Sequence, residues 1–144
     1  MEWIELGELC EIKGGQGAPQ NKDTYSDEGV PFIRAGDLQA LVEGELPDVC
    51  DKIKQEVGDA KGLKLQEKGT VVFAKSGMSC LKSYIYWLPI SCYAVNHLAC
   101  LTVTDNRLIS KYLSYALNFI KPKILINDLS YPSIRLSDIA KMTI

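Results

Sequence analysis

Short apolar runs in the middle of the chain predict a set of β-strands. Residues 71–74 form a continuous apolar run after Gly69 and Thr70, which is typical of a buried strand. Four other segments are rich in valine, isoleucine, tyrosine or threonine, which favour strands: 30–34, 83–88, 92–95 and 97–104. These runs predict a core that is built mainly from β-structure.

A longer stretch, 107–120, has the periodicity of an amphipathic helix. Its apolar residues recur at the i, i+3, i+4, i+7 spacing that places them on one face, at positions 109, 112, 113, 116, 117 and 120. Asp105 or Asn106 is placed to cap the start of this helix, and Pro122 ends it.

The remaining segments predict shorter elements. They are a helix or turn at 6–12, a poorly periodic loop with one helical turn at 43–58, a strand or turn at 124–126, a loop at 127–133 and a helix at 138–141 that Ser137 caps. The order of these elements is several strands, one main helix, and then a short strand and a short helix. It is not the regular alternation of strands and helices that is typical of βαβ folds. The order therefore predicts an α+β fold with a mixed or antiparallel β-sheet core, helix 107–120 and short flanking helices.

The composition is that of one folded domain over residues 1–144. Of the 144 residues 47% are hydrophobic, and the net charge is only −2, so the chain can bury a core and is not disordered. There is no internal repeat and no long spacer helix. No apolar run approaches the roughly 18 residues of a membrane span, and the N-terminal residues lack the pattern of a signal peptide. We therefore expect a cytoplasmic protein without membrane contact.

No metal or cofactor site is expected. The five cysteines include no C-x-x-C pair, which indicates free thiols in a reducing compartment, and one histidine is too few for a typical zinc site. That histidine, His97, lies in an apolar strand pattern, where it is expected to pack rather than to catalyse. The glycine-rich loop 14–17 lacks the G-K-[ST] ending and the third glycine of nucleotide-binding loops.

One pattern could still indicate an enzyme. Asp48, followed by Asp59-Ala60-Lys61, has the residue types with which a nuclease binds Mg²⁺ and activates water. Such carboxylates normally lie on adjacent strands, whereas 49–58 has no strand periodicity. A Mg²⁺-dependent nuclease therefore remains an alternative, and no catalytic residue is assigned.

Charge is distributed unevenly along the chain. Residues 1–60 carry 14 acidic and 5 basic side chains, whereas residues 61–144 carry 4 acidic and 11 basic ones. A protein with an acidic pI does not coat nucleic acid indiscriminately, but it can present a local basic face to it. The acidic half is equally compatible with a protein-interaction module, and the bias as a whole with an ordinary mixed surface.

Six segments resemble, in order, the target recognition domain of type I restriction–modification specificity subunits. They are 3–15, 25–38, 68–77, 96–99, 112–117 and 131–139. The first has a tryptophan, then Leu-Gly and a glycine-ended turn. The second contains Gly-Val-Pro-Phe-Ile at 29–33 and Asp-Leu at 37–38, which match the central block of the family.

This resemblance implies a non-catalytic domain that reads double-stranded DNA in a prokaryotic restriction system. In that family one such domain recognises half of a split target, and a full subunit resembles two domains joined by long helices. Those helices dock the methyltransferase and restriction subunits, so the expected partners are DNA, these subunits and a second specificity half or a second copy of the chain. Residues 1–144 correspond to one domain only.

The candidate DNA contacts are polar or basic residues on predicted loops. Glutamine and asparagine can bind adenine, lysine and arginine can bind guanine or phosphate, and tyrosine can pack on a sugar or base. The candidates are Gln16, Gln20, Asn21, Lys22, Arg34, Lys75, Ser76, Ser79, Lys82, Ser83, Tyr84, Tyr131, Ser133 and Arg135.

Each group of candidates also has a simpler interpretation. The loop 16–22 can be an idle polar loop, and the loop 75–84 a solvated hairpin. Arg34 can pair with Asp37 instead of guanine, and Tyr131 can hold a turn together with Pro132.

Overall fold

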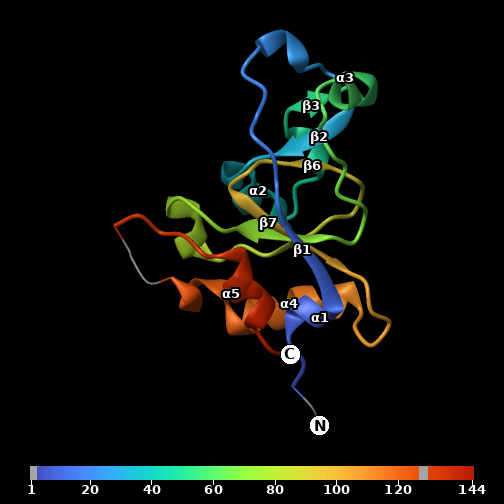
Figure 1. Ribbon diagram of the computed structural model, residues 1–144. Coiled ribbons are helices and arrows are strands. Elements are labelled where there is room, and N and C mark those ends of the chain that lie inside the picture. The colour runs from blue at the N-terminus through green and yellow to red at the C-terminus, as the bar shows by residue number, and fades with distance from the viewer. Residues whose placement is uncertain (1–2, 127–129) are drawn as a thin grey trace.

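Two small β-sheets form the framework of the protein (Figure 1). The computed structural model describes residues 3–126 and 130–144. The larger sheet has four antiparallel strands in the order β1 (Cys10–Gly14), β7 (Leu98–Val103), β4 (Val71–Ala74) and β5 (Tyr86–Trp87). In the smaller sheet β2 (Val30–Ile33) pairs antiparallel with β3 (Lys52–Ile53) and parallel with β6 (Tyr93–Ala94). The predicted α+β class with a mixed sheet core is confirmed.

Helices cover the larger sheet and flank the smaller one. The α-helices are α1 (Leu6–Leu9), α2 (Leu38–Val42), α3 (Gln55–Ala60), α4 (Ser110–Ile120) and α5 (Leu136–Lys141). The 3-10 helices are η1 (Lys22–Thr24), η2 (Ala35–Asp37), η3 (Pro47–Val49), η4 (Met78–Lys82) and η5 (Pro122–Leu125). Figure 1 shows α1, α4 and α5 below the larger sheet, and the smaller sheet with α3 above it. None of the helices in these ranges is long and apolar enough to cross a membrane.

The main helix, α4, packs on the sheet through the apolar stripe that its sequence predicts. Leu113 and Leu117 are buried against the core. At its first turn Ser110 Oγ accepts a hydrogen bond from Trp87 Nε1 (3.0 Å), and the Lys111 ammonium lies 4.2 Å from the centre of the Trp87 ring. These contacts fasten α4 to strand β5, because they give the partly buried indole of Trp87 both a partner for its N–H and a cation over its ring.

The boundaries of both C-terminal helices differ from the prediction. The main helix begins at Ser110 rather than at 107, and the residue before it, Ile109, makes no side-chain cap. Asp105 instead accepts the backbone N–H of Arg107 (2.9 Å) at the start of a separate turn, 105–108, so it begins that turn and does not cap the helix. Helix α5 begins one residue before Ser137. Segment 124–126, predicted as a strand or turn, is not a strand, because the 3-10 helix η5 continues to Leu125.

Several shorter elements also differ from the prediction. Segment 6–12, predicted as one helix or turn, divides into α1 and strand β1. Segment 43–58, predicted as a loop with one helical turn, contains η3, strand β3 and the start of α3. Of 83–88 only Tyr86–Trp87 is a strand. Of the predicted loop 127–133, residues 127–129 lie outside the described residues.

All five cysteines are buried free thiols, as the sequence predicts. Burial raises the pKa of Cys92 and of Cys100 to about 12, so both remain protonated at neutral pH.

Tyr93 carries a buried hydroxyl for which the described residues offer no hydrogen-bond partner. An unpaired buried hydroxyl costs free energy, so we expect Tyr93→Phe to leave the free energy of unfolding unchanged or to raise it by up to about 1 kcal/mol. Tyr25→Phe is the matched control, because the Tyr25 hydroxyl has two partners and its loss should cost about 1–2 kcal/mol. Urea denaturation of both variants measures the difference. A loss at Tyr93 as large as that at Tyr25 would contradict the assignment.

Candidate nucleic-acid interface

Three segments that are far apart in the sequence are joined edge to edge beyond the end of β4. The backbone N–H of Lys75 donates to His97 O (2.8 Å), and Ile134 N–H donates to Lys75 O (2.7 Å). Gly77 N–H donates to Pro132 O (3.0 Å). Ser76 and Ser133 are thereby opposed in an antiparallel bridge. The larger sheet is thus extended by a piece of chain from the C-terminal region.

The extension exposes polar side chains in alternation. Pro132 and Ile134 are buried, whereas Tyr131, Ser133 and Arg135 are exposed. Successive side chains of an extended chain point to opposite sides, so these three share one side. Ser76 is a non-hydrogen-bonded partner of Ser133, and the side chains of such a pair lie close together.

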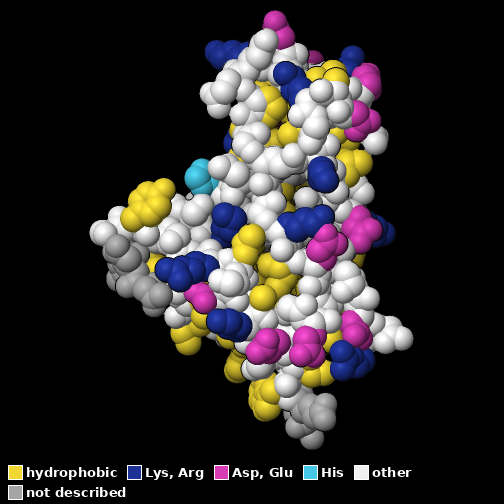
Figure 2. All heavy atoms as spheres, viewed as in Figure 1, with side chains coloured by type: hydrophobic (Ala, Val, Ile, Leu, Met, Phe, Trp, Pro, Cys, Tyr) yellow, Lys and Arg dark blue, Asp and Glu magenta, His cyan; other side chains and the backbone are white. Residues whose placement is uncertain are grey.

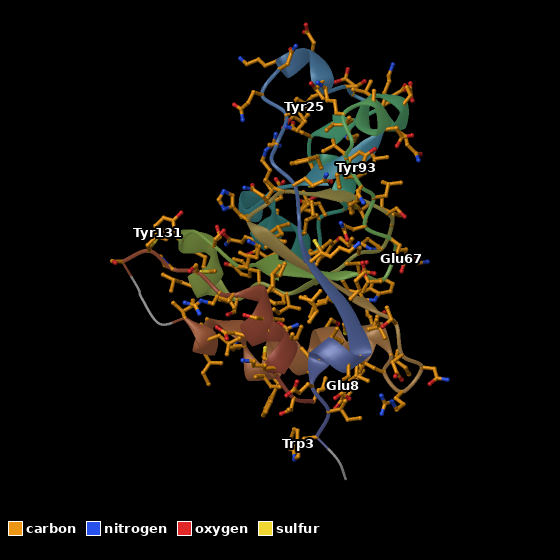
Figure 3. The ribbon with its side chains drawn as sticks, in the orientation of Figure 1. Trp3, Glu8, Tyr25, Glu67, Tyr93 and Tyr131 are labelled. Carbon is orange, nitrogen blue, oxygen red and sulfur yellow. The ribbon has the colours of Figure 1, made fainter. Side chains whose placement is uncertain are left out.

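We call the five side chains gathered here the polar face: Ser76, His97, Tyr131, Ser133 and Arg135. His97 joins it because its Nδ1 shares a hydrogen bond of 2.7 Å with Ser76 Oγ. This bond leaves His97 Nε2 available to a ligand. Figure 3 shows Tyr131 projecting from the left of the molecule, well apart from Tyr25 and Tyr93 in its upper part.

His97 is the member of the polar face that sequence reasoning missed. It was predicted to pack inside a strand, but β7 begins only at Leu98, and His97 is exposed in the turn that precedes it. The signal was the pair Asn96-His97, two polar residues that interrupt an apolar run and are more typical of a turn than of a strand interior.

Lys75 lies on the other side of the extended segment. The end of its side chain passes beside Gly14 of β1, where it would lie 3.1 Å from an added Cβ. Burial raises the pKa of the Cys100 thiol, and the positive charges of Lys75 and Lys13 partly offset this rise. The predicted contact Lys75 is therefore not part of the polar face.

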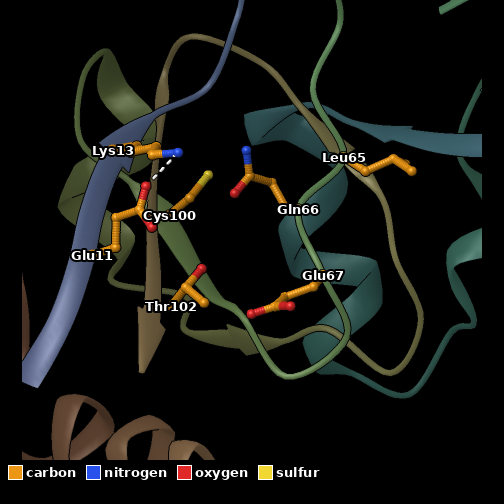
Figure 4. Close-up of a pocket in the computed structure, with 7 residues that line it drawn as sticks. All are labelled: Glu11, Lys13, Leu65, Gln66, Glu67, Cys100 and Thr102. Carbon is orange, nitrogen blue, oxygen red and sulfur yellow. Dashed lines mark ion pairs between the residues drawn. The ribbon is translucent and has the colours of Figure 1, made fainter. Parts of the chain in front are cut away.

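A separate polar pocket of about 230 Å³ lies beside strands β1 and β7 (Figure 4). Its lining includes the ion pair of Lys13 with Glu11, together with Gln66, Glu67 and Cys100. Because burial keeps the Cys100 thiol protonated, the pocket holds no activated nucleophile at this position.

The rest of the loop after β4 is folded rather than open. Residues 78–82 form the 3-10 helix η4, on which Lys82 is exposed and Ser79 is half-buried. Ser83 follows with a left-handed backbone (φ 51°) and is buried, and Tyr84 packs partly against the core. Of these four predicted contacts, Lys82 is the most accessible.

The N-terminal candidates lie on a second loop, between β1 and β2 in the upper part of the molecule. Gln20, Asn21 and Lys22 are exposed there, although Asn21 Oδ1 already accepts the Asp23 backbone N–H (2.9 Å). Gln16 is engaged at both ends of its amide. Its Nε2 donates to Gly62 O (2.9 Å), and its Oε1 accepts from the N–H of Lys64 (2.7 Å).

The guanidinium group of Arg34 does not pair with Asp37, the protein partner that the sequence suggests. Nη1 donates to Asp51 (2.7 Å) and Nη2 to the Tyr25 hydroxyl (3.0 Å). Only the backbone N–H of Arg34 binds Asp37 (2.8 Å). Since both ends of its fork are used, Arg34 is not presented to a ligand.

The residues of the nuclease alternative are not arranged as that chemistry requires. Asp48 lies in the 3-10 helix η3, and Asp59 lies in helix α3 with Lys61 just after it, rather than on adjacent strands. Within residues 3–126 and 130–144 no cluster of three histidine, cysteine or acidic side chains is placed to hold a metal ion. Nothing in this arrangement favours the nuclease.

Basic side chains lie near the middle of the molecule on the face seen in Figure 2. That view shows Lys and Arg (dark blue) across the middle, and Asp and Glu (magenta) mostly toward the upper and lower ends and the right. A local basic region of this kind attracts phosphate groups even when the net charge is slightly negative.

Comparison with known proteins identifies relatives of this fold. The chain is 28% identical over 139 residues to the type I restriction enzyme MjaIX specificity subunit of Methanocaldococcus jannaschii, which covers 93% of this chain and 31% of that protein. Three similar solved structures come from a study of complex assembly and conformational transition in the type I R-M system, an S subunit from M. genitalium, and the HsdS subunit from Thermoanaerobacter tengcongensis.

The structural likeness covers nearly the whole chain. The TM-scores are 0.68, 0.64 and 0.61 at 23%, 17% and 24% identity, over 99%, 99% and 96% of this chain and 33%, 34% and 34% of those chains. The chain therefore spans about a third of the length of these relatives. The model of the family described as Type I restriction modification DNA specificity domain matches residues 1–144, and the chain belongs to that family.

Proposed function

We propose that this domain recognises one half of a bipartite target in double-stranded DNA, as part of a type I restriction–modification specificity subunit. The observation that carries the proposal is the polar face, whose hydroxyl, imidazole and guanidinium groups can bind base edges and phosphates. Backbone pairing to the larger sheet holds this face in place, so its geometry is set before DNA arrives. Membership of the specificity-domain family supports the same function.

The proposed contact set is smaller than the one expected from the sequence. It comprises the polar face, Lys82 on η4, and Gln20, Asn21 and Lys22 on the upper loop. Lys75 is left out, because its side chain lies on the other side of the extended segment and runs toward Gly14. Ser79 and Tyr84 are left at its margin, because they are only half exposed. Gln16, Arg34 and Ser83 are excluded as direct contacts, because their polar groups are engaged or buried.

We further propose that the domain has no catalytic activity of its own and requires no cofactor. In the longer protein it would direct a partner methyltransferase and a partner restriction subunit to the bound site, in the cytoplasm of a prokaryote. A second specificity half, or a second copy of the chain, would read the other half of the target.

Selection of bound duplexes from a randomised DNA pool at low salt tests the proposal. We expect enrichment of a motif of about 3–5 base pairs, the reach of a few side chains in one groove. The logarithm of the affinity should fall linearly with the logarithm of salt concentration, with a slope of about −0.9 per phosphate contacted.

Two other outcomes have distinct meanings. Salt-dependent binding without an enriched motif would contradict half-site recognition by this chain alone and would leave a phosphate-binding domain. If no duplex binds at any salt concentration, the DNA-binding proposal fails and the acidic protein-interaction module is favoured.

A further inference from the structure

The upper loop, residues 15–25, is fastened at both of its ends, and the side chains in its middle are exposed. At its start Gly15 N–H donates to Leu98 O (3.0 Å), Gln16 N–H donates to Ala94 O (2.9 Å), and the Gln16 side chain binds the backbone at 62 and 64. At its end the Tyr25 hydroxyl donates to Pro19 O (2.8 Å). The exposed residues Gln20, Asn21 and Lys22 lie between these two fixed points.

Arg34 is the group that holds the second fixed point. Its guanidinium carbon lies 5.2 Å from the centre of the Tyr25 ring and 5.3 Å from that of Phe32, and its Nη2 donates to the Tyr25 hydroxyl. Its other end is tied to Asp51, just before strand β3. The planar fork of arginine can make both bonds while its face lies against a ring, which a lysine cannot do.

The resulting chain of contacts runs from the smaller sheet to the tip of the loop. Asp51 fixes Arg34, Arg34 fixes the Tyr25 hydroxyl, and that hydroxyl fixes Pro19, immediately before Gln20. At the tip, Thr24 is buried, and Asn21 closes the turn of η1 by accepting from Asp23. The loop is thus ordered in the free protein, and little conformational entropy remains to be lost when a ligand binds.

We propose that Arg34 is a positioning residue that, through Tyr25, holds residues 19–22 in the shape in which Gln20 and Lys22 meet DNA. The inference rests on the DNA-recognition function proposed above. It gives Arg34 an indirect role in place of the direct contact with guanine that its position at the end of a strand suggests.

The experiment compares Arg34→Lys, Tyr25→Phe and wild type for binding to the enriched duplex over a range of salt concentrations. We expect Arg34→Lys to weaken binding about tenfold and Tyr25→Phe somewhat less, because each releases the loop. The salt slope should fall by up to about 1 in both, although neither substitution removes a charge, because the released loop loses the Lys22 phosphate contact. Arg107→Lys is the matched control: Arg107 also binds a carboxylate, that of Asp105, near the start of α4, and this variant should bind as wild type does.

A double-mutant cycle separates positioning from general weakening of the fold. Lys22→Ala should weaken binding and reduce the salt slope by about 1 in the wild type, but should have less than about a twofold effect in the Arg34→Lys background. Arg135→Ala should have the same effect in both backgrounds, because it belongs to the polar face. Tyr25→Phe, which keeps the ring and the guanidinium, carries the same cycle if Arg34→Lys does not fold.

The inference is overturned if Lys22→Ala lowers the salt slope by about a further 1 in the Arg34→Lys background, because Lys22 would then still contact phosphate without being positioned by Arg34. It is equally overturned if the Arg34 and Tyr25 variants bind like wild type, or if Lys22→Ala has no effect or an equal effect in both backgrounds. Failure of wild type to bind any duplex would instead refute the proposed function on which the inference rests.

Discussion

Gly15→Ala is expected to destabilise the protein by about 3–5 kcal/mol, enough to unfold a large part of it at 37 °C. An added Cβ would lie 2.1 Å from Val95 O and 2.4 Å from Ala94 O, and both are backbone atoms that cannot rotate away. Relief requires the chain to move out, which breaks the hydrogen bonds of Gly15 with Leu98 and of Gln16 with Ala94. Overpacking costs typically 1–3 kcal/mol, and each lost backbone bond adds about 1.

Denaturation by urea, followed by circular dichroism, measures this effect. Gly17→Ala is the matched control on the same loop, because no atom lies within 4 Å of its added Cβ and the residue is exposed. That variant should remain within about 1 kcal/mol of wild type. A loss below about 1 kcal/mol for Gly15→Ala would contradict the expected clash, because it would mean that the added methyl group is accommodated without breaking these two hydrogen bonds.

Ser133→Asp is expected to weaken DNA binding at least about 100-fold without loss of stability. Ser133 is exposed at the centre of the polar face, and its side chain supports no packing. A carboxylate there would meet DNA phosphates in a contact where like charges cost several kcal/mol. The measurement is the affinity for the enriched duplex at low salt, together with the thermal melting temperature.

Ser91→Asp provides the control, because Ser91 is an exposed serine in the connection between β5 and β6. It adds the same charge to the protein, so it should weaken binding no more than about twofold. Equal effects of the two substitutions would mean that net charge, not the polar face, governs binding.

The sequence predicted those elements whose pattern of apolar residues extends over a whole strand or over several helical turns. The buried run in β4 and the stripe of α4 were found because each repeats its pattern over its whole length. Strand β3 has two residues, which is too short for any periodicity, and β1 directly follows the helical turn α1, so the two were read as one element.

The candidate site was predictable as a set of loops but not as a surface. Tyr131, Ser133 and Arg135 alternate with buried Pro132 and Ile134, a local pattern that a reader of the sequence can recognise. Their pairing with Ser76 and His97 joins distant segments, which no local pattern reveals. For the same reason Gln16 and Arg34 were predicted as contacts: their chemistry suits a DNA base as well as it suits Gly62 or Asp51.

The bridge between Ser76 and Ser133 has a consequence for how such a domain can change its target. Its hydrogen bonds connect main-chain atoms only, from Gly77 to Pro132 and from Ile134 to Lys75. Side chains at 131, 133 and 135 can therefore be exchanged while the buried residues between them keep the segment in register. For the DNA recognition proposed above, mutation would explore new base preferences one residue at a time, and we expect each intermediate along that path to fold.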